Sequence, residues 1–438
     1  MNIGPRPRAL VCALVTVLIL ASARTDALSA EPASNESRRS RWFNQPLATG
    51  NWNGFRDRLI DSGVTIRFGW KGLFNSVVDG GLLQNPASFQ QEWKLSLNLD
   101  LEKIAGVAGL SFDGVVRYRD GLNATGLVGG SPLFSPTYLE GGKGFRLTTL
   151  AFTWKSQNLL WTKDAIVARA GWIRPVDTFI QQTENRFFGN NAFTTNGIAN
   201  MPWSGSYTTW RGELRVKPVD WHYIQLGLYS AFPGTTTKKN NGLDFDGVPY
   251  TPKGIFFIAE TGFTPKIGPD RLPGKYAAGM FYWGIDNTGF DGGHHEANET
   301  YFLEADQMIF REHSTDKKLT SQGLYVFNLL TLSPPQNSTF PVFFQTGFLY
   351  EGLIPGRDAD KLGFGFAWGQ YSHDRIETRR EAGQTTQRIY EAALELGYRV
   401  QVAKSSWIQP YIQYILNPGG ENNIRNATVL GFHMGVDF

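Results

Sequence analysis

The chain contains 438 residues, of which 42 are Lys or Arg and 39 are Asp or Glu, so its formal net charge is +3. Such a balanced chain has no overall electrostatic field for binding nucleic acid. Its only cysteine, Cys12, lies in an N-terminal apolar segment that we expect to be removed. We therefore expect no disulfide, thiolate nucleophile or cysteine metal site in the mature protein.

The N-terminal segment has the pattern of a secretory signal peptide. Arg6 and Arg8 precede an apolar run over residues 9–20, and small residues follow it. The run is shorter than the roughly 20 apolar residues that a membrane-spanning helix needs, although an uncleaved anchor is the alternative. We predict a signal peptide over residues 1–30, with cleavage after Ala23 or Ala30.

Residues 31–63 are predicted to form a polar periplasmic leader that ends in a short helix. Within residues 47–63, Phe55, Leu59 and Ile60 recur at helical spacing, and Gly63 is suited to end the helix. Residues 64–438 are predicted to form the main domain.

From Val64 onward, apolar and polar residues alternate with a period of two, which is typical of strands with one apolar and one polar face. In the clearest run, over residues 89–101, Trp93 and Leu95 alternate with Glu92 and Lys94. Candidate strands begin at residue 64 and then cover residues 89–101, 110–119, 146–157, 165–174, 206–217, 221–230, 254–263, 275–285, 300–310, 322–331, 341–350, 361–371, 388–400, 406–416 and 427–438. The alternation is least clear over residues 254–331, so a count of about sixteen could differ by two.

The length of these runs favours a membrane barrel over a soluble sandwich. They span about 10 to 13 residues, whereas soluble strands usually have about 5–6, and a tilted strand needs about 9–11 to cross the hydrocarbon layer. The connections also alternate between long segments, such as residues 120–145, 175–205 and 231–253, and short ones, such as residues 102–109, 218–220 and 401–405. We predict an all-β fold, a transmembrane antiparallel up-and-down barrel whose apolar face meets lipid and whose charged face lines water.

The last strand ends the chain in a form that suits a barrel better than a soluble sheet edge. Leu430, Phe432, Met434, Val436 and Phe438 alternate with small or polar residues up to the C-terminal aromatic. An exposed apolar edge of this length would be an aggregation hazard in a soluble protein. The pattern resembles the terminal strand that outer-membrane assembly machinery recognises.

Five motifs in the right order resemble the OprB-type carbohydrate-selective porins, over roughly residue 45 to the end. Residues 49–64 match the opening T-G-x-W-x-G-x-R-x-x-L-x-x-x-G-V, although Ala48, Asn51 and Asn53 replace the usual Leu, Asp and Gly. Residues 305–307 resemble an A-D-Q strand, and residues 352–360 match G-L-x-P-G-R-x-x-D. Residues 391–396 and 414–420 resemble the penultimate strands and their loop. This resemblance implies a sixteen-stranded barrel with a short periplasmic helix, and diffusion of glucose and similar sugars past a charged constriction.

The polar strand face supplies the candidate pore-lining residues. A sugar hydroxyl both donates and accepts hydrogen bonds, so interleaved cations and carboxylates can replace its hydration through weak, repeated contacts. The predicted lumen residues are Arg67, Lys71, Glu92, Lys94, Asp113, Arg117, Arg119, Arg211, Glu213, Arg215, Glu391, Glu395 and Arg399. The alternative for each is a salt bridge that only braces the wall. Trp203 or Trp210 could stack on a sugar ring, although most tryptophans and tyrosines fit an interfacial belt better.

The sequence predicts a passive outer-membrane porin for small neutral sugars, with no catalytic residue, no metal and no cofactor. His294 and His295 lack a matching second pair of metal ligands, and residues 377–381 are predicted to be a solvated loop tip. The expected partners are sugars and outer-membrane lipid, and a monomer and a homotrimer both remain open. Three alternatives are a porin for anions, organic acids or general small solutes, a barrel enzyme with a nucleophile near a strand end, and a soluble exported sugar-binding protein.

Overall fold

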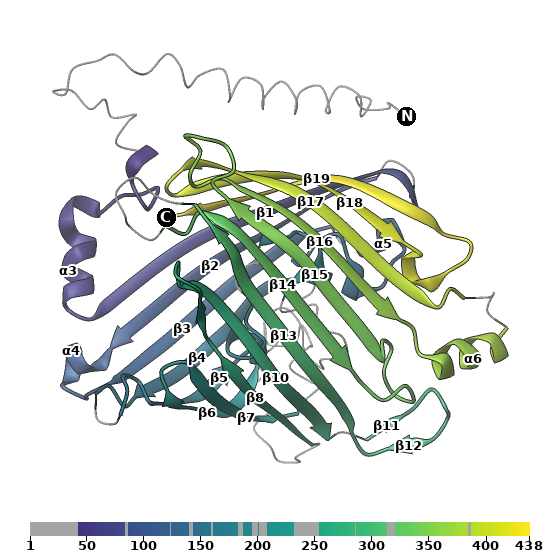
Figure 1. Ribbon diagram of the computed structural model, residues 1–438, viewed down its shortest axis with the longest axis horizontal. Coiled ribbons are helices and arrows are strands. Elements are labelled where there is room, and N and C mark those ends of the chain that lie inside the picture. Colours follow the sequence, from purple (N-terminus) through teal and green to yellow (C-terminus); the bar gives the residue numbers. More distant parts are fainter. Residues whose placement is uncertain are drawn as a thin grey trace.

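The structure, a computed structural model, describes residues 43–83, 86–122, 124–139, 143–158, 161–182, 187–194, 200, 208–231, 254–284, 286–312, 320–383 and 387–438. Sixteen long antiparallel strands form a closed barrel (Figure 1). They are β1 (Val64–Gly81), β2 (Ala87–Asp100), β3 (Leu110–Gly121), β4 (Gly144–Lys155), β5 (Ile166–Ile173), β6 (Thr209–Val219), β7 (His222–Ser230), β8 (Ile255–Phe263), β10 (Leu272–Gly284), β13 (Asn298–Arg311), β14 (Gly323–Leu332), β15 (Val342–Glu351), β16 (Lys361–Gln370), β17 (Tyr390–Ala403), β18 (Ser406–Leu416) and β19 (Arg425–Asp437).

The barrel closes between its first and last long strands. Strand β1 pairs with β2 along one edge, where Trp70 lies opposite Trp93, and with β19 along the other, where Phe74 lies opposite Phe432. The predicted fold class and strand count are therefore confirmed, and every candidate strand coincides with one of the sixteen. Closure pairs both edges of each of the sixteen long strands, as the hydrocarbon layer requires.

Short elements mark the two ends of the barrel (Figure 1). At the helix end lie η1 (Trp52–Gly54), α3 (Phe55–Asp61), α4 (Leu101–Ala105) and the two-residue strand β9 (Lys266–Ile267). At the loop end lie α5 (Thr125–Val128), α6 (His373–Glu381) and a hairpin of β11 (Asn287–Thr288) with β12 (His294–His295). No helix in the described ranges combines the length and the hydropathy needed to span a bilayer.

The predicted N-terminal helix is present but shorter than residues 47–63. Gly63 follows the helix with φ +93°, a conformation that glycine adopts without strain, and its carbonyl accepts a hydrogen bond from the amide of Asp100. Arg56 lies 4.0 Å from the ring centroid of Trp52 and donates to the carbonyl of Gly50 at 2.7 Å. The opening motif thus forms a compact turn at the helix end. The predicted signal peptide lies outside the described residues.

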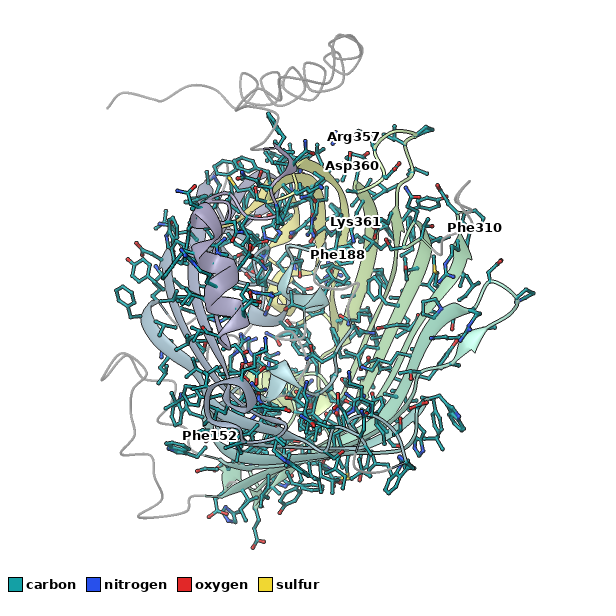
Figure 2. The ribbon with its side chains drawn as sticks, turned by 90° about the vertical axis from the view of Figure 1, so that its left-hand side faces the viewer. Phe152, Phe188, Phe310, Arg357, Asp360 and Lys361 are labelled. Atoms are coloured by element: carbon teal, nitrogen blue, oxygen red, sulfur yellow. The ribbon has the colours of Figure 1, made fainter. Side chains whose placement is uncertain are left out.

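Side-chain exposure follows the predicted alternation, with apolar residues outside and charged residues inside. Leu95 is 47% exposed and Phe152 52%, whereas Glu92 is 5% exposed and Arg119 3%. Figure 2 looks onto the helix end and shows Phe152 on the outside of the wall and Phe188 inside the barrel. An apolar exterior with charge turned inward is the pattern expected when lipid surrounds the barrel.

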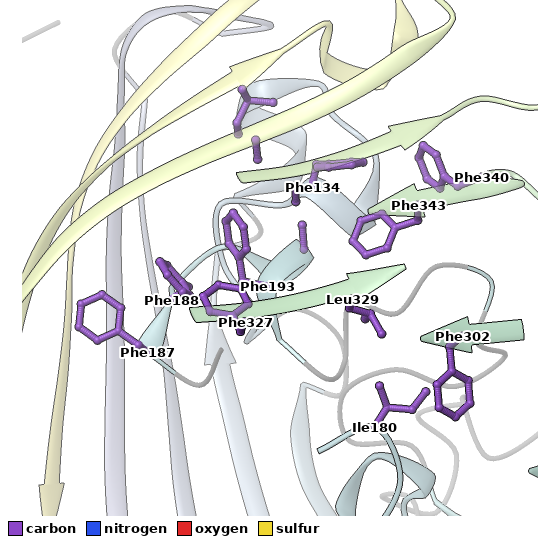
Figure 3. Packing of buried hydrophobic residues seen from close by; sticks show 14 of the residues in the cluster. Phe134, Ile180, Phe187, Phe188, Phe193, Phe302, Phe327, Leu329, Phe340 and Phe343 are labelled. Atoms are coloured by element: carbon purple, nitrogen blue, oxygen red, sulfur yellow. The ribbon is translucent and has the colours of Figure 1, made fainter. Parts of the chain in front are cut away.

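The lumen is not charged all round, because two long loops fold into it and pack on an apolar part of the wall. The connection between β3 and β4 contributes η2 (Pro132–Phe134), and that between β5 and β6 contributes η3 (Pro175–Asp177) and η5 (Asn191–Phe193). Aromatic rings of these connections contact inward-facing rings of β13–β15 (Figure 3). The ring centroids of Phe188 and Phe327 are 5.5 Å apart, and those of Phe134 and Phe343 are 6.2 Å apart. We call this the inner apolar cluster.

Strand β16 is shaped to receive these loops. Its inward positions include Gly363, Gly365 and Gly369. A β-carbon built on Gly365 would lie 2.7 Å from Phe193, and one built on Gly363 would lie 2.5 Å from Phe187. The missing side chains therefore provide the space in which the loop rings pack.

One motif of the resemblance has a structural role at the helix end. In the turn between β15 and β16, Arg357 binds Asp360 with two hydrogen bonds of 2.8 Å. The same carboxylate accepts from the hydroxyl of Tyr398 at 3.0 Å and from the amide of Gln401 at 2.9 Å. Figure 2 shows Arg357 and Asp360 at the rim of the barrel. The G-L-x-P-G-R-x-x-D turn thus ties two hairpins together.

The stretch over residues 377–381 differs from its prediction as a solvated loop tip. It forms the second half of α6, which begins after Ser372, whose hydroxyl accepts a hydrogen bond from the amide of Arg375. Arg379 lies 2.8 Å from a carboxylate oxygen of Glu421. The charges that suggested solvation thus belong to a capped helix that is paired with a neighbouring loop.

Candidate permeation site

The inner apolar cluster fills one side of the lumen, and a cavity of about 530 Å³ remains beside the β1–β3 wall. This main cavity falls within the range of about 300–1,000 Å³ that is usual for small-molecule sites. Its lining is Gly69, Trp70, Lys71, Glu92, Lys94, Arg117, Arg119, Tyr138, Arg174, Val176, Asp177, Thr194, Arg399, Trp407 and Asp437. The wall strands and the folded-in loops therefore build it together.

Neighbouring strands place the wall charges in register. Lys71 of β1 lies opposite Glu92 of β2, which lies opposite Arg119 of β3, and Lys94 lies opposite Arg117. Glu92 accepts from both Arg117 and Arg119 at 2.6 Å. The period of two puts these side chains on one face, and the antiparallel register makes them neighbours.

A folded-in loop adds an ion pair that the sequence did not predict. Arg174 and Asp177, at the start of the β5–β6 connection, form a salt bridge beside the main cavity. Burial acts to raise the pKa of the Asp177 carboxyl, but the positive charges of Arg174 and Arg117 outweigh it and lower the pKa to about 2. No periodic signal marks a loop residue, so only the folded loop places this acceptor in the lumen.

Aromatic side chains also line the main cavity, and Trp407 lies two strands from Lys71 along the wall. Arg399 lies 4.1 Å from the ring centroid of Trp407 and donates to Gln409 at 2.8 Å. The hydroxyl of Tyr138 lies 2.9 Å from Nε2 of His433, and burial raises the pKa of this phenol well above its usual value, so it remains protonated. Trp407 and Tyr138 therefore offer aromatic surfaces at this site.

Of the two tryptophans considered from the sequence, the structure describes Trp210, which does not line the main cavity. Trp210 packs edge-on against Trp172, with their centroids 5.7 Å apart. Trp203 lies outside the described residues. Trp407 was missed because tryptophans were assigned to the interfacial belt, although it shares the inward face of β18 with Gln409 and Gln413.

A second cavity, of about 380 Å³, adjoins the main one at Asp177, which lines both. The predicted residues Glu213 and Arg215 line it, together with Arg169 and Gln225. Arg211 lies next to this cavity without lining it and pairs with Glu213 at 2.9 Å. The hydroxyl of Tyr229 also donates to Glu213, at 3.0 Å. Charge thus continues along the β5–β7 wall.

Glu391 and Glu395 face inward as predicted, but they hold loops instead of lining either cavity. Both are completely buried. Glu395 accepts from the amides of Gly189 and Asn190 at 2.8 Å each. Glu391 accepts from the amide of Ser131 at 3.1 Å and from the hydroxyl of Tyr371 at 2.6 Å. Sequence alternation placed these carboxylates on the correct face, but it could not show that loop amides cover them.

The remaining predicted residues lie apart from both cavities. Arg67 is exposed near the helix end. Asp113 accepts a hydrogen bond from the side-chain amide of Asn98 at 2.8 Å and braces β2 against β3. In the part of the chain that the structure describes, no three His, Asp or Glu side chains are grouped to hold a metal ion. His295 instead lies 3.0 Å from Asp291 in the β11–β12 hairpin.

Comparisons with known proteins give a consistent result. The family model of the carbohydrate-selective porins, OprB family, matches residues 84–438. Porin B of Pseudomonas aeruginosa is 27% identical, over 94% of each chain, and a putative porin, QuiX, of Acinetobacter baylyi is 22% identical, over 89% of this chain and 92% of that one. The high-pH structure of Pseudomonas putida OprB superposes with a TM-score of 0.81 at 22% identity, covering 90% of this chain and 99% of that one. At that identity, the structural likeness concerns the fold.

Proposed function

Because this chain belongs to the OprB family of carbohydrate-selective porins, we propose that it conducts small neutral sugars such as glucose through the main cavity. The chain is a porin of the outer membrane and not an enzyme. We propose both that the solute is a small neutral sugar and that residues around the main cavity contact it.

The observation that carries the proposal is the mixture of donors, acceptors and aromatic rings around the main cavity. Arg117, Arg119 and the two lysines supply donors, and Glu92 and Asp177 supply acceptors. A hydroxyl-rich solute can exchange its water for these groups. Trp407, whose ring also contacts the Arg399 guanidinium, lines the cavity beside these groups, and its remaining apolar surface can contact the C–H face of a sugar.

The lining also suits transport better than retention. The two acceptors are already engaged, Glu92 by two guanidinium groups and Asp177 by Arg174. Each therefore offers only its remaining lone pairs to a passing sugar. Weak contacts along a path allow entry and release, whereas a tight site would block the pore.

The test is uptake into proteoliposomes of glucose and of a polyethylene glycol matched to it in size. We expect glucose to enter faster than the polymer and faster than into protein-free vesicles. Arg117→Ala and Arg119→Ala should each change glucose uptake, whereas the matched control Arg425→Ala, which breaks an exposed pair with Asp79, should not. Equal entry of both solutes would leave a general diffusion porin, and unchanged glucose uptake in both lumen variants would remove these arginines from the path.

A further inference from the structure

We infer that the main cavity favours sugars that carry a carboxylate, such as aldonic acids, over neutral sugars of the same size. This inference rests on the proposed function, because the acidic sugar would use the same path. It concerns the balance of charge on the residues that line that path.

Cations outnumber carboxylates around the main cavity. Its lining includes Lys71, Lys94, Arg117, Arg119, Arg174 and Arg399, against Glu92, Asp177 and Asp437. Glu92 already lies between Arg117 and Arg119, and Asp177 is paired with Arg174. Asp437 is at the end of β19, at the helix end of the barrel. The carboxylates present therefore do not neutralise the wall.

Arg399 also has no ion-pair partner in the described ranges, but it donates to Gln409 and to the carbonyl of Phe187, so the lining cations without such partners are two lysines. In the described ranges, no carboxylate lies within ion-pair distance of Lys71 or Lys94, and the ammonium nitrogen of Lys71 lies 5.9 Å from the ring centroid of Tyr138. The two lysines occupy diagonal positions on β1 and β2, where Cα atoms are about 7–8 Å apart. A single carboxylate can approach both ammonium groups at once.

The strand register places Lys94 beside a further cation, whereas Lys71 lies opposite Glu92. Lys94 lies directly opposite Arg117, and like charges in directly opposite positions destabilise a sheet. A bound or passing carboxylate relieves this repulsion, as rings of Lys and Arg do in anion pores. A cation would meet the opposite effect.

The other lining groups suit the rest of an acidic sugar. With its carboxylate near Lys71 and Lys94, its hydroxyls can donate to free lone pairs of Glu92 and Asp177, and its carbon skeleton can lie along Trp407. A simple inorganic anion lacks the hydroxyls that these acceptors require. The geometry therefore points to a hydroxyl-rich monocarboxylate.

The experiment compares uptake of gluconate, glucose and glucosamine into proteoliposomes at low salt, about 0.01 M, where charges are screened only beyond about 30 Å. These probes have similar sizes and differ in charge. At about 7 Å in water, one unit charge changes the local concentration of a monovalent ion by about three-fold. We expect gluconate to enter faster than glucose and glucosamine slower, and Lys71→Gln/Lys94→Gln to reduce gluconate uptake by about ten-fold.

Two controls separate the inference from its premise. Lys266→Gln/Lys404→Gln removes the same charge from exposed positions outside both cavities and should leave gluconate uptake unchanged. The zero-current potential of the unaltered protein in a potassium chloride gradient should show a preference for chloride over potassium. Because this measurement needs no variant, it does not depend on whether the variants fold. Glucose entry with no preference for gluconate, or equal gluconate uptake in both double variants, would overturn the inference and leave the sugar porin intact. Failure of all three solutes to enter would overturn both.

Discussion

Removal of the Glu395 carboxylate should release the folded-in loop and widen the pore. This carboxylate accepts from the amides of Gly189 and Asn190 at 2.8 Å each, and from the side-chain amide of Gln413 at 3.1 Å. In Glu395→Ala the two buried backbone amides lose their acceptor, at about 1–3 kcal/mol each. The docked loop should therefore lose about 2–6 kcal/mol, which is at least a ten-fold change in its docking equilibrium, since about 1.4 kcal/mol corresponds to ten-fold.

Single-channel conductance in planar bilayers measures this change directly. The loop contributes Thr194 and Asp177 to the main cavity, so its release should raise the conductance and expose the loop to proteases. Glu351→Ala is the matched control, because it removes a partly exposed carboxylate that pairs with Lys361 at 2.9 Å, a contact worth at most about 1 kcal/mol. If Glu395→Ala and Glu351→Ala both kept the conductance and protease resistance of the unaltered protein, the role of Glu395 as a loop anchor would be refuted.

Two further predictions concern packing and charge. Gly365→Ala should overpack the space that the Phe193 ring occupies and destabilise the barrel by about 1–3 kcal/mol, which would lower the temperature at which heating shifts the electrophoretic mobility of the barrel. Gly212→Ala is the control and should not lower this temperature, because its added carbon meets nothing within 4 Å. Equal temperatures for the two variants would contradict the packing account. The lowered pKa of Asp177, about 2 against an ordinary 3.8, means that its stabilising charge is present above pH 3.8 and is lost only as the pH falls through about 2. The difference in ion selectivity between the unaltered protein and Asp177→Asn should therefore persist from pH 7 to pH 4, and convergence of the two at pH 4 would count against the ion pair with Arg174.

The charged wall illustrates how far alternation predicts a site. Lys71, Glu92, Lys94, Arg117 and Arg119 were placed on one face from the sequence, and the register brings them together around the main cavity. Their arrangement follows from a rule that acts residue by residue, because each strand position faces either lipid or the interior. The ion pairs among them depend on which residues of neighbouring strands the register aligns. The sequence of a single strand does not specify that register.

The sequence by itself determined the barrel, because the lipid environment constrains every strand independently. Every second residue must be apolar where the wall meets hydrocarbon, and a strand must be long enough to cross it. Leu95 and Phe152 are exposed on the outer face, as the alternation within their own strands predicts, and no other strand is needed for that prediction. The fold class, the strand positions and the short N-terminal helix were therefore predictable.

Only the tertiary structure decided what fills the lumen. The inward faces of β13 and β14 carry Phe302 and Phe327, which belong to the inner apolar cluster. Strand β14 is therefore mainly apolar on both faces, and the inward face of β13 mixes apolar residues with Glu304 and Asp306, so the alternation of both strands is weak. The same packing turns Glu395 from a lining residue into an anchor and brings Asp177 to the cavity. The bilayer acts on every outward residue alike, whereas an inward residue meets whichever loop reaches it, and that contact is set by parts of the chain far away in sequence.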